Sequence, residues 1–554
     1  MTRHVMDFSY KNRNQFIATL KRHHFDVLVI GGGITGAGIA LDAASRGLGV
    51  ALVEKDDFAS GTSSRSTKLV HGGLRYLKQF EFALVKEVGS ERAVIHQLAP
   101  HLVLPEKMLL PLREHRGYGS ILTSLGLKLY DWLAGVTGKD RRLMLTRRQA
   151  LRREPLLKKD DVKGGALYAE YRTDDARLTI EVVKKAHKYG ATALNYCEVA
   201  QLKYSDRGKV CGALVRDNIS GESFDVWSQV VVNATGPWVD QLRAMDKPVE
   251  GKRLHLTKGV HIVLPRGKLP IRQSIYFDVA DGRMVFAIPR GNTTYVGTTD
   301  TDYQGNPDKV VITRQDAQYL VDGVNENFPG ANLHVEDIES GWAGLRPLVH
   351  EEGKAASALS RKDEVFVSAS GLYSIAGGKL TGYRKMAERI VDMVVGGLPQ
   401  KKAVLKCYTQ KIRLADGQLT NTKRVGRYVA ALKKRLQKFG LEGEVATYLC
   451  GNYGKQSDKI LAKLKAARGE GIHLALLKEE LRYGVENEMV CSSVDFFKRR
   501  TGRLYFDMES VLKYKGPVID GLAGLLGWDD EGKNKDALRL ETELLEARNF
   551  LKKE

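Results

Sequence analysis

The chain first shows a regular pattern of apolar and polar positions at residue 25. A short apolar run at residues 25–30 ends in glycines, small residues follow to about residue 46, and a second apolar run covers residues 49–54. Apolar runs of this length beside glycine indicate buried strands, and the small residues between them indicate a helix that packs on a sheet. The pattern therefore predicts a β–α–β unit that follows a polar and basic arm.

The pattern changes again further along the chain. Helix and strand alternate over residues 176–250, short alternating runs at 251–345 predict antiparallel strands, and residues 365–395 predict a strand, a double glycine and a helix. After residue 399 the chain is rich in Lys, Leu, Ala and Glu at helical spacing. We therefore expect four parts: an N-terminal arm (1–24), a discontinuous first domain (25–104, 176–250 and 346–398), a second domain (105–175 and 251–345) and a helical C-terminal domain (400–554).

Composition and charge narrow the class of protein. The 554 residues are 43% hydrophobic and 28% charged, which is an ordinary globular balance and excludes a disordered or collagen-like chain. A formal net charge of +21 favours an anionic partner, which can be nucleic acid, a membrane surface or a substrate. Five scattered cysteines without a C-x-x-C pair indicate a reducing compartment and neither a zinc site nor a disulfide framework. Apolar runs stay well short of the ~18 residues that a membrane-spanning helix needs, so we expect none.

The first turn carries a dinucleotide fingerprint. Gly31, Gly33 and Gly36 form G-x-G-x-x-G directly after the first predicted strand. The first glycine permits a tight turn, the second lets the backbone approach a pyrophosphate, and the third lets the helix pack on the strand. Glu54 ends the second predicted strand, where a carboxylate accepts hydrogen bonds from an adenosine ribose. An adenine dinucleotide is predicted at this turn.

Three later segments favour FAD over NAD. A hydroxyl-rich loop at residues 58–68 replaces the third β–α unit that is usual in a nicotinamide dehydrogenase, and residues 230–236 form a strand that ends in an Ala-Thr-Gly turn. Residues 375–381 repeat the strand–glycine–helix arrangement, and the start of that helix can face the flavin ring, where negative charge builds on reduction. Together they predict FAD bound along its length.

These motifs, and above all the run T-K-L-V-H-G-G-L-R-Y-L at residues 67–77, resemble the FAD-dependent glycerol-3-phosphate dehydrogenase family. The resemblance covers residues 24–395, and the segment after about 405 is similar to the family's C-terminal cap domain. It implies an α/β fold: a glutathione-reductase-like FAD-binding Rossmann domain, an antiparallel-sheet substrate domain and a helical cap. The chain has no D-x-[DN]-x-[DN]-G loop, so the calcium-binding extension of mitochondrial members is not expected and the aerobic, respiratory bacterial type is favoured.

The resemblance implies oxidation of sn-glycerol 3-phosphate to dihydroxyacetone phosphate, with hydride transferred to the flavin. Residues expected at the cofactor share its motifs and are Gly31, Gly33, Ile34, Thr35, Gly36, Glu54, Lys55, Thr62, Ser63, Ser66, Lys68, His71, Gly72, Val199, Ala234, Gly236, Trp238, Gly378, Lys379, Leu380 and Thr381. Residues expected at the substrate phosphate are Arg75, Tyr76, Arg346, Arg361 and Lys379, of which Arg346 and Lys379 are also assigned to catalysis.

The reaction also needs a base for the hydroxyl proton. Histidine titrates near neutrality, and His261, at the entry to a predicted strand, is the preferred candidate. A histidine that merely satisfies a sheet edge is an equally common explanation. His71 is the rival, although its glycine neighbours indicate a place beside the flavin.

The electron acceptor is left open between membrane quinone and dioxygen. Residues 118–136 contain Leu125, Leu129 and Trp132 in an apolar stripe between clusters of basic residues, which is typical of a helix lying in a membrane interface and also compatible with core packing. With the net charge, this stripe favours a cytoplasmic dehydrogenase that binds the anionic inner face of the cell membrane peripherally and reduces quinone. The alternative is a glycerol-3-phosphate oxidase that produces hydrogen peroxide. An amine or amino-acid oxidase is a further alternative, and a homodimer is a further expectation.

A second basic amphipathic helix is predicted at residues 423–436. Such a helix can contact a membrane, cover the domain as a solvated cap, or bind nucleic acid. A nucleic-acid-binding C-terminal module is therefore the alternative of a different class. It lacks a zinc finger or an aromatic recognition motif, so we expect no nucleic acid partner.

Overall fold

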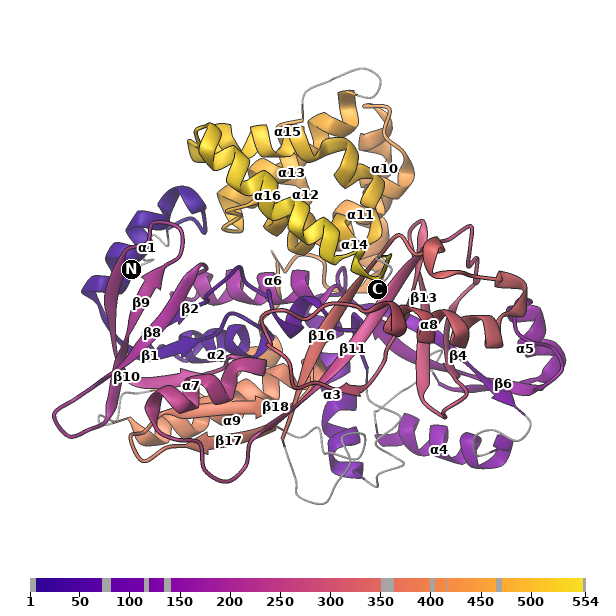
Figure 1. Cartoon of the computed structure of the whole chain (residues 1–554), viewed down its shortest axis with the longest axis horizontal. Coiled ribbons are helices and arrows are strands. Elements are labelled where there is room, and N and C mark those ends of the chain that lie inside the picture. Colours follow the sequence, from indigo (N-terminus) through magenta and orange to yellow (C-terminus); the bar gives the residue numbers. More distant parts are fainter. Residues whose placement is uncertain are drawn as a thin grey trace.

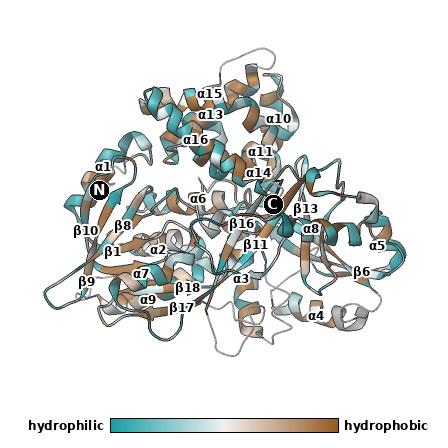
Figure 2. Ribbon diagram, viewed as in Figure 1, coloured by the Kyte–Doolittle hydropathy of each residue, from teal (hydrophilic) through white to brown (hydrophobic). Residues whose placement is uncertain are grey.

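The computed structural model describes residues 6–71, 81–113, 119–133, 141–349, 363–398, 404–415, 417–464 and 471–551. Two sheets lie side by side, and the C-terminal helices cover one edge of both (Figure 1). Hydrophobic residues concentrate in the strands, whereas loops and outer helices carry hydrophilic residues (Figure 2). This arrangement confirms the predicted α/β fold class with its helical C-terminal part.

The first sheet is the Rossmann-type sheet. Its parallel strands follow the order β18 (Tyr373–Gly377), β10 (Ser223–Asn233), β1 (His24–Ile30), β2 (Val50–Val53) and β7 (Thr192–Leu194). The antiparallel strands β17 (Asp363–Val367), β8 (Cys197–Tyr204) and β9 (Val210–Asp217) extend it. The helices that pack with it are α2 (Ile34–Ser45), α6 (Asp175–Lys188), α7 (Val239–Asp246) and α9 (Tyr383–Gly397).

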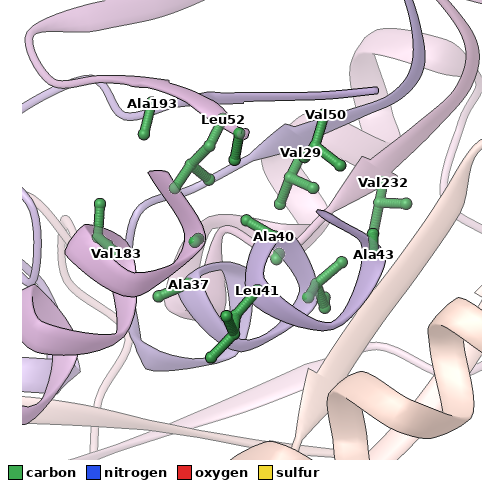
Figure 3. Close-up of a cluster of buried hydrophobic side chains, with 14 of the residues drawn as sticks. Val29, Ala37, Ala40, Leu41, Ala43, Val50, Leu52, Val183, Ala193 and Val232 are labelled. Atoms are coloured by element: carbon green, nitrogen blue, oxygen red, sulfur yellow. The ribbon is translucent and has the colours of Figure 1, made fainter. Parts of the chain in front are cut away.

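Small residues bring α2 close to this sheet. Ala37, Ala40 and Ala43 of α2 lie among valines and leucines of the strands (Figure 3). A Cβ at Gly36 would lie 1.9 Å from the carbonyl oxygen of Gly31, so a side chain at position 36 would push the helix off the turn. The third glycine of the fingerprint therefore sets the helix position.

The N-terminal segment is helical and packed. It contains η1 (Tyr10–Asn12) and α1 (Arg13–Arg22), and α1 buries Phe16, Ile17 and Leu20 in the core of the first sheet. The segment predicted as an arm is therefore part of the first domain where it is described.

The second sheet is mainly antiparallel, as the alternation predicted. Its strand order is β15 (Thr301–Asp302), β11 (Leu254–Pro265), β14 (Thr293–Gly297), β13 (Met284–Arg290), β12 (Ser274–Asp278), β4 (Leu104–Arg113), β6 (Val162–Arg172) and β3 (Leu69–Val70). Two further strands, β16 (Ser340–Val349) and β5 (Leu143–Thr146), pair with β11 and β6. The flanking helices are α3 (Phe82–Leu98), α4 (Gly119–Leu133), α5 (Arg147–Arg153) and α8 (Arg314–Asn327).

One expected domain boundary falls inside a strand. All ten residues of β16 pair with β11 in the second sheet, so a division between residues 345 and 346 would cut a continuous ladder. Arg346 is consequently held by the second sheet.

The C-terminal region consists of helices. They are α10 (Thr422–Gln437), α11 (Gly443–Tyr453), α12 (Ser457–Ala462), α13 (Gly471–Asn487), the π-helix η12 (Asp495–Arg500), α14 (Arg503–Phe506), α15 (Met508–Leu526) and α16 (Asp530–Glu546). Val425, Leu432 and Leu436 of α10 are buried in this region's own core. The apolar side of this helix is therefore already covered and is not available for insertion into a membrane.

Candidate active site

A cavity of about 1210 Å³ lies where the carboxyl ends of the parallel strands meet the second sheet. From the first sheet its walls include the turns after β1, β2, β10 and β18, and from the second sheet they include parts of β11 and β16. Ligands of α/β sheets bind at this edge because the helix N-termini and the loops after the strands converge there.

The fingerprint turn forms one end of the cavity. Gly31 adopts a φ of 110°, a left-handed conformation that favours glycine. Gly33, Ile34 and Thr35 line the cavity at the start of α2, and the Ile34 N–H donates a hydrogen bond to the Ser63 hydroxyl oxygen at 2.9 Å. A helix N-terminus with backbone N–H groups at a cavity is a ready site for a phosphate group.

Glu54 closes the same end of the cavity. Its carboxylate accepts hydrogen bonds from the N–H groups of Gly32, at 2.6 Å, and Asp56, at 3.0 Å. Burial, and after it the neighbouring charge of Asp56, raise the pKa of the Glu54 carboxyl to about 7 against the opposing effect of these two hydrogen bonds. The carboxyl group therefore changes its charge near neutral pH.

A cluster beside Glu54 joins the two sheets. The Lys55 ammonium lies 2.6 Å from a carboxylate oxygen of Asp308 and 4.3 Å from the centroid of the Trp238 ring. The Trp238 indole N–H donates to the same Asp308 oxygen at 2.9 Å. Lys55 and Trp238 both line the cavity, so this cluster connects the two sheets at the Glu54 end of the cavity.

Most of the other residues expected at the cofactor also line the cavity: Thr62, Ser63, Ser66, His71, Val199, Ala234, Gly236, Gly378, Lys379, Leu380 and Thr381. Gly36 instead packs α2 on the turn, as described above. The structure places Lys68 behind the cavity wall, where its buried ammonium lies 2.5 Å from Asp175. Lys68 therefore fixes the loop that presents Ser66 and Thr67, and the expected direct contact of Lys68 with the cofactor does not fit this position.

The second glycine turn follows β18. In the first sheet, β10 and β1 separate β18 from β2, the strand that Glu54 follows. Gly377 and Gly378 have φ values of 76° and 77°, and a Cβ at Gly378 would lie 2.5 Å from the Met386 sulfur. The Thr381 hydroxyl donates to the His71 carbonyl oxygen at 3.2 Å. This contact ties the turn before α9 to the loop that carries the rival histidine.

His261 is buried in the second sheet and lines the cavity. It faces Gly297 on β14, where a Cβ would lie 2.2 Å from the imidazole Cδ2, so glycine at 297 makes room for the ring. The ring stacks on Trp342 with a centroid separation of 4.8 Å, and its Nε2 lies 2.9 Å from the Thr67 hydroxyl. The imidazole is thereby held in one orientation.

The pKa of His261 lies well below its usual value. Burial is the largest cause, and the positive charges of Arg346 and Lys68 add to it by disfavouring the imidazolium. The imidazole is therefore neutral at pH 7, and one of its ring nitrogens carries an unprotonated lone pair.

Arg346 lies next to His261 in the same wall of the cavity. Its guanidinium donates to the Thr298 hydroxyl at 2.7 Å and the Thr299 carbonyl oxygen at 3.1 Å, and it lies 3.1 Å from an Asp300 carboxylate oxygen. A Cβ at Gly259 would lie 2.3 Å from this guanidinium, so glycine there opens the space that it occupies. An anion that binds Arg346 competes with Asp300 for it.

The structure thus brings His261, Arg346, Lys379 and His71 to one cavity. Gly72, Arg75, Tyr76 and Arg361 lie outside the described residues. Sequence reasoning missed Thr298 and Asp300, whose segment has no motif, and it named Thr67 only as part of the run at residues 67–77. No group of three or more His, Cys, Asp or Glu side chains that could hold a metal occurs in the described parts of the chain.

Comparison with known proteins agrees with this geometry. The model of the FAD dependent oxidoreductase family matches residues 26–384, and the C-terminal domain of alpha-glycerophosphate oxidase matches residues 407–533. An aerobic glycerol-3-phosphate dehydrogenase of Bacillus subtilis is 48% identical over 98% of both chains, and one of Staphylococcus saprophyticus is 46% identical over the same share of both. The chain belongs to the FAD-dependent glycerol-3-phosphate dehydrogenase family.

Solved structures support the same assignment. A glycerol-3-phosphate dehydrogenase from Bacillus halodurans complexed with FAD has a TM-score of 0.84 and 42% identity, and covers 99% of this chain and 100% of its own. An L-alpha-glycerophosphate oxidase from Mycoplasma pneumoniae, at 18% identity and a TM-score of 0.53 over 70% of this chain and 99% of its own, shares the fold. These comparisons confirm three predictions: the family resemblance inferred from the motifs, the fold class, and FAD as the cofactor.

The residues present fit FAD. The glycine turn and the start of α2 provide backbone N–H groups for a pyrophosphate, and Glu54 offers a carboxylate to a ribose. The cavity continues from Glu54 to the glycine turn before α9, which gives the extended space that a two-part nucleotide needs.

Among the described residues, every helix is too short or too polar to cross a membrane.

Proposed function

We propose that this chain oxidises sn-glycerol 3-phosphate at C2 to dihydroxyacetone phosphate and passes the electrons to membrane quinone. The observation that carries the first part is the neutral, buried His261 beside Arg346 in the cavity that holds the FAD motifs. A base next to a cation suits a substrate that has a hydroxyl group to deprotonate and an anionic group to bind.

Each residue has a separate role in this proposal. The imidazole of His261 accepts the C2 hydroxyl proton, and we assign the proton to Nε2 because the Thr67 hydroxyl bound to that nitrogen also lines the cavity. Arg346 and Lys379 hold the phosphate group, for which the planar guanidinium offers paired donors. FAD, when bound, supplies the acceptor for the C2 hydride.

The substrate can be tested by anaerobic mixing of the yellow holoenzyme with single candidates. We expect sn-glycerol 3-phosphate to bleach the flavin, and glycerol, which lacks the phosphate, to bleach it only at far higher concentration. Bleaching by glycine or sarcosine, without bleaching by glycerol 3-phosphate, would instead identify an amine oxidase.

The quinone assignment is supported by the surface of α4. Leu127 and Tyr130 of this helix are buried against the second sheet, whereas Leu125, Leu129 and Trp132 are 57%, 37% and 76% exposed. Apolar side chains on one face of a surface helix, with a tryptophan among them, are typical of helices that lie in a membrane interface. With a net charge of +21, this face supports peripheral binding to the anionic inner side of the cell membrane, where quinone is dissolved.

The two acceptors give different products from the same flavin reduction. We expect vesicles that contain quinone to accept electrons rapidly and little peroxide to form in air. Rapid peroxide formation without quinone would show an oxidase and would contradict this half of the proposal.

A further inference from the structure

The C-terminal segment Asp495–Phe506 packs against the walls of both halves of the cavity. The cofactor half surrounds Glu54 and the fingerprint turn, and the substrate half surrounds His261 and Arg346. It consists of the π-helix η12 (Asp495–Arg500), a turn at Gly502, and α14 (Arg503–Phe506). The arginines of η12 and Tyr505 of α14 are buried although the segment belongs to a separate helical region. Such burial indicates tight contact with the two sheets.

The π-helix holds the loop after β2. Asp57 of this loop is fully buried and lies 2.7 Å and 2.8 Å from the two terminal nitrogens of Arg500, in a bidentate pair. The Arg499 Nε donates at 2.5 Å to Asp57 Oδ2, the oxygen that Arg500 Nη1 also contacts. The two guanidinium groups hold the pKa of the Asp57 carboxyl well below its usual range, so the carboxyl stays charged.

This loop is part of the cofactor site. Asp57 stands three residues after Glu54, and the Ala59 N–H donates to the carbonyl oxygen of Gly32 in the fingerprint turn at 3.1 Å. A Cβ at Gly32 would lie 2.7 Å from the Phe58 ring, which shows how closely the loop packs on the turn. A shift of Asp57 would therefore move the wall that presents Glu54 and the glycine turn.

The helix α14 holds the other half of the cavity. Tyr505 and Phe506 pack on Trp342 with centroid separations of 5.0 Å and 5.7 Å, and Trp342 in turn stacks on His261. The Ser340 hydroxyl donates to the Tyr505 carbonyl oxygen at 2.7 Å, which ties α14 to the start of β16. Trp342 thus contacts both His261 and the C-terminal region.

We infer that the segment Asp495–Phe506 is a positioning element that couples the cofactor half of the site to its substrate half. Arg500 and Arg499 set the loop at Glu54, and Tyr505 and Phe506 set the stack that orients His261. The second part rests on the role proposed for His261, whereas the first part needs only FAD. Because coupling is reciprocal, FAD binding at the loop must also steady the segment.

Hydrogen exchange of the intact wild-type protein tests this coupling without any substitution. FAD added to the apoprotein should slow amide exchange in residues 495–506 as well as in the fingerprint turn. Unchanged exchange in residues 495–506, with protection confined to the turn and to Glu54, would overturn the coupling.

Two matched variants test the cofactor side. Arg500→Met should raise the Kd of FAD at least ~10-fold, because it leaves Asp57 as a buried charge with one partner fewer. Lys184→Met is the control, because Lys184 is also buried and ion-paired to Glu488 of the C-terminal region but lies away from the cavity. Equal changes in the Kd of FAD for the two variants would mean general loosening of the interface and would overturn the assignment.

Phe506→Ala tests the substrate side. We expect an unchanged Kd of FAD, a flavin reduction by glycerol 3-phosphate that is ~10-fold slower, and an acid limb of the pH–rate profile that moves as the His261 stack loosens. An unchanged rate and pH profile would overturn the role of α14. Failure of glycerol 3-phosphate to reduce even the wild type would refute the proposed function, and the FAD-binding tests would remain valid.

Discussion

The two halves of the cavity differ in the groups that line them: backbone groups of the glycine turn lie at the centre of the cofactor half, and side chains dominate the substrate half. The centre of the cofactor half is one stretch of chain, in which β1, the glycine turn, α2, β2 and the following loop succeed one another, and the turns after β10 and β18 complete it. The glycine turn presents mainly backbone N–H groups. The substrate half is made by side chains from β11 and β16 and from the loop at Thr67, which are far apart in sequence.

This difference shows in the electrostatics of the two halves. Glu54 is stabilised by neighbouring N–H groups of its own β–α–β unit, so its surroundings follow from the local sequence. The low pKa of His261 depends on burial by Trp342 and on the charges of Arg346 and Lys68, which only the folded sheet brings near. A site made of backbone is determined locally, whereas a site made of side chains is determined by their distant neighbours.

Removal of the proposed base should have the largest effect, because it impairs the reaction in the substrate half and leaves FAD binding in the cofactor half unchanged. His261→Ala should slow flavin reduction by glycerol 3-phosphate by ~10²–10⁴-fold, the usual scale of general-base catalysis, and leave the Kd of FAD unchanged. Anaerobic stopped-flow reduction measures the rate. His255→Ala, on the same strand but at the surface, is the matched control. An effect below about threefold would return the role of base to His71 or to another group.

Membrane binding by the exposed face of α4 should be independent of both halves of the cavity. Leu125, Leu129 and Trp132 replaced together by Ser should weaken vesicle binding by ~10²-fold or more, because burial of each apolar side chain in the interface contributes ~1.5–3 kcal/mol. Turnover with a soluble dye should be kept. Replacement of the exposed Leu512, Leu538 and Leu545 on α15 and α16 is the control and should leave vesicle binding intact. Full vesicle binding by the α4 variant would count against this surface.

The anion-binding side chains should affect substrate and not cofactor. Arg346→Ala and Lys379→Ala should each raise the KM for glycerol 3-phosphate ~10- to 150-fold, since a lost charged partner removes ~1.5–3 kcal/mol. Steady-state kinetics with a soluble dye measures this, with Arg314→Ala, a surface arginine paired to Glu336, as the control. Unchanged kinetics in both variants would refute the phosphate site.

The cofactor half should respond to pH through Glu54. Because burial raises the pKa of this carboxyl to about 7, the charged form that best accepts ribose hydrogen bonds forms above pH 7 and is lost as the pH falls. The Kd of FAD should therefore rise by up to ~10-fold per pH unit below 7. Titration of the apoprotein with FAD at several pH values measures this. Glu54→Gln should bind FAD more weakly and with no such dependence, and a persisting dependence would exclude Glu54 as its source.

The substrate half should respond to pH in a different range. Burial and the two cations lower the pKa of His261, so the neutral base persists as the pH falls below 6.5. The ratio of the wild-type kcat/KM to that of His261→Ala should stay constant from pH 8 to below 6.5. Protonation of the substrate phosphate near pH 6 affects both enzymes equally and cancels in this ratio. A fall in this ratio centred at the ordinary histidine value would show that the cations do not act on the ring.

The sequence predicted the local geometry of the fingerprint turn, since glycine spacing and Glu54 mark a β–α–β unit whose contacts lie close together along the chain. It could not show that Lys68 turns away from the cavity to Asp175 or that Asp300 pairs with Arg346, because these contacts link distant segments. The two basic amphipathic helices make the same point: α10 buries its apolar side in the C-terminal core, while α4 leaves Leu125 and Trp132 exposed. Their periodicity is alike, and only the neighbours in the fold distinguish them.

The most direct test of the central claim is anaerobic flavin reduction by sn-glycerol 3-phosphate that carries deuterium at C2. If the cavity places this carbon for hydride transfer with His261 as the base, deuterium at C2 should slow bleaching, deuterium at C1 or C3 should not, and dihydroxyacetone phosphate should form in equal amount to reduced flavin. Bleaching that is insensitive to deuterium at C2, or no bleaching by this substrate, would contradict the account.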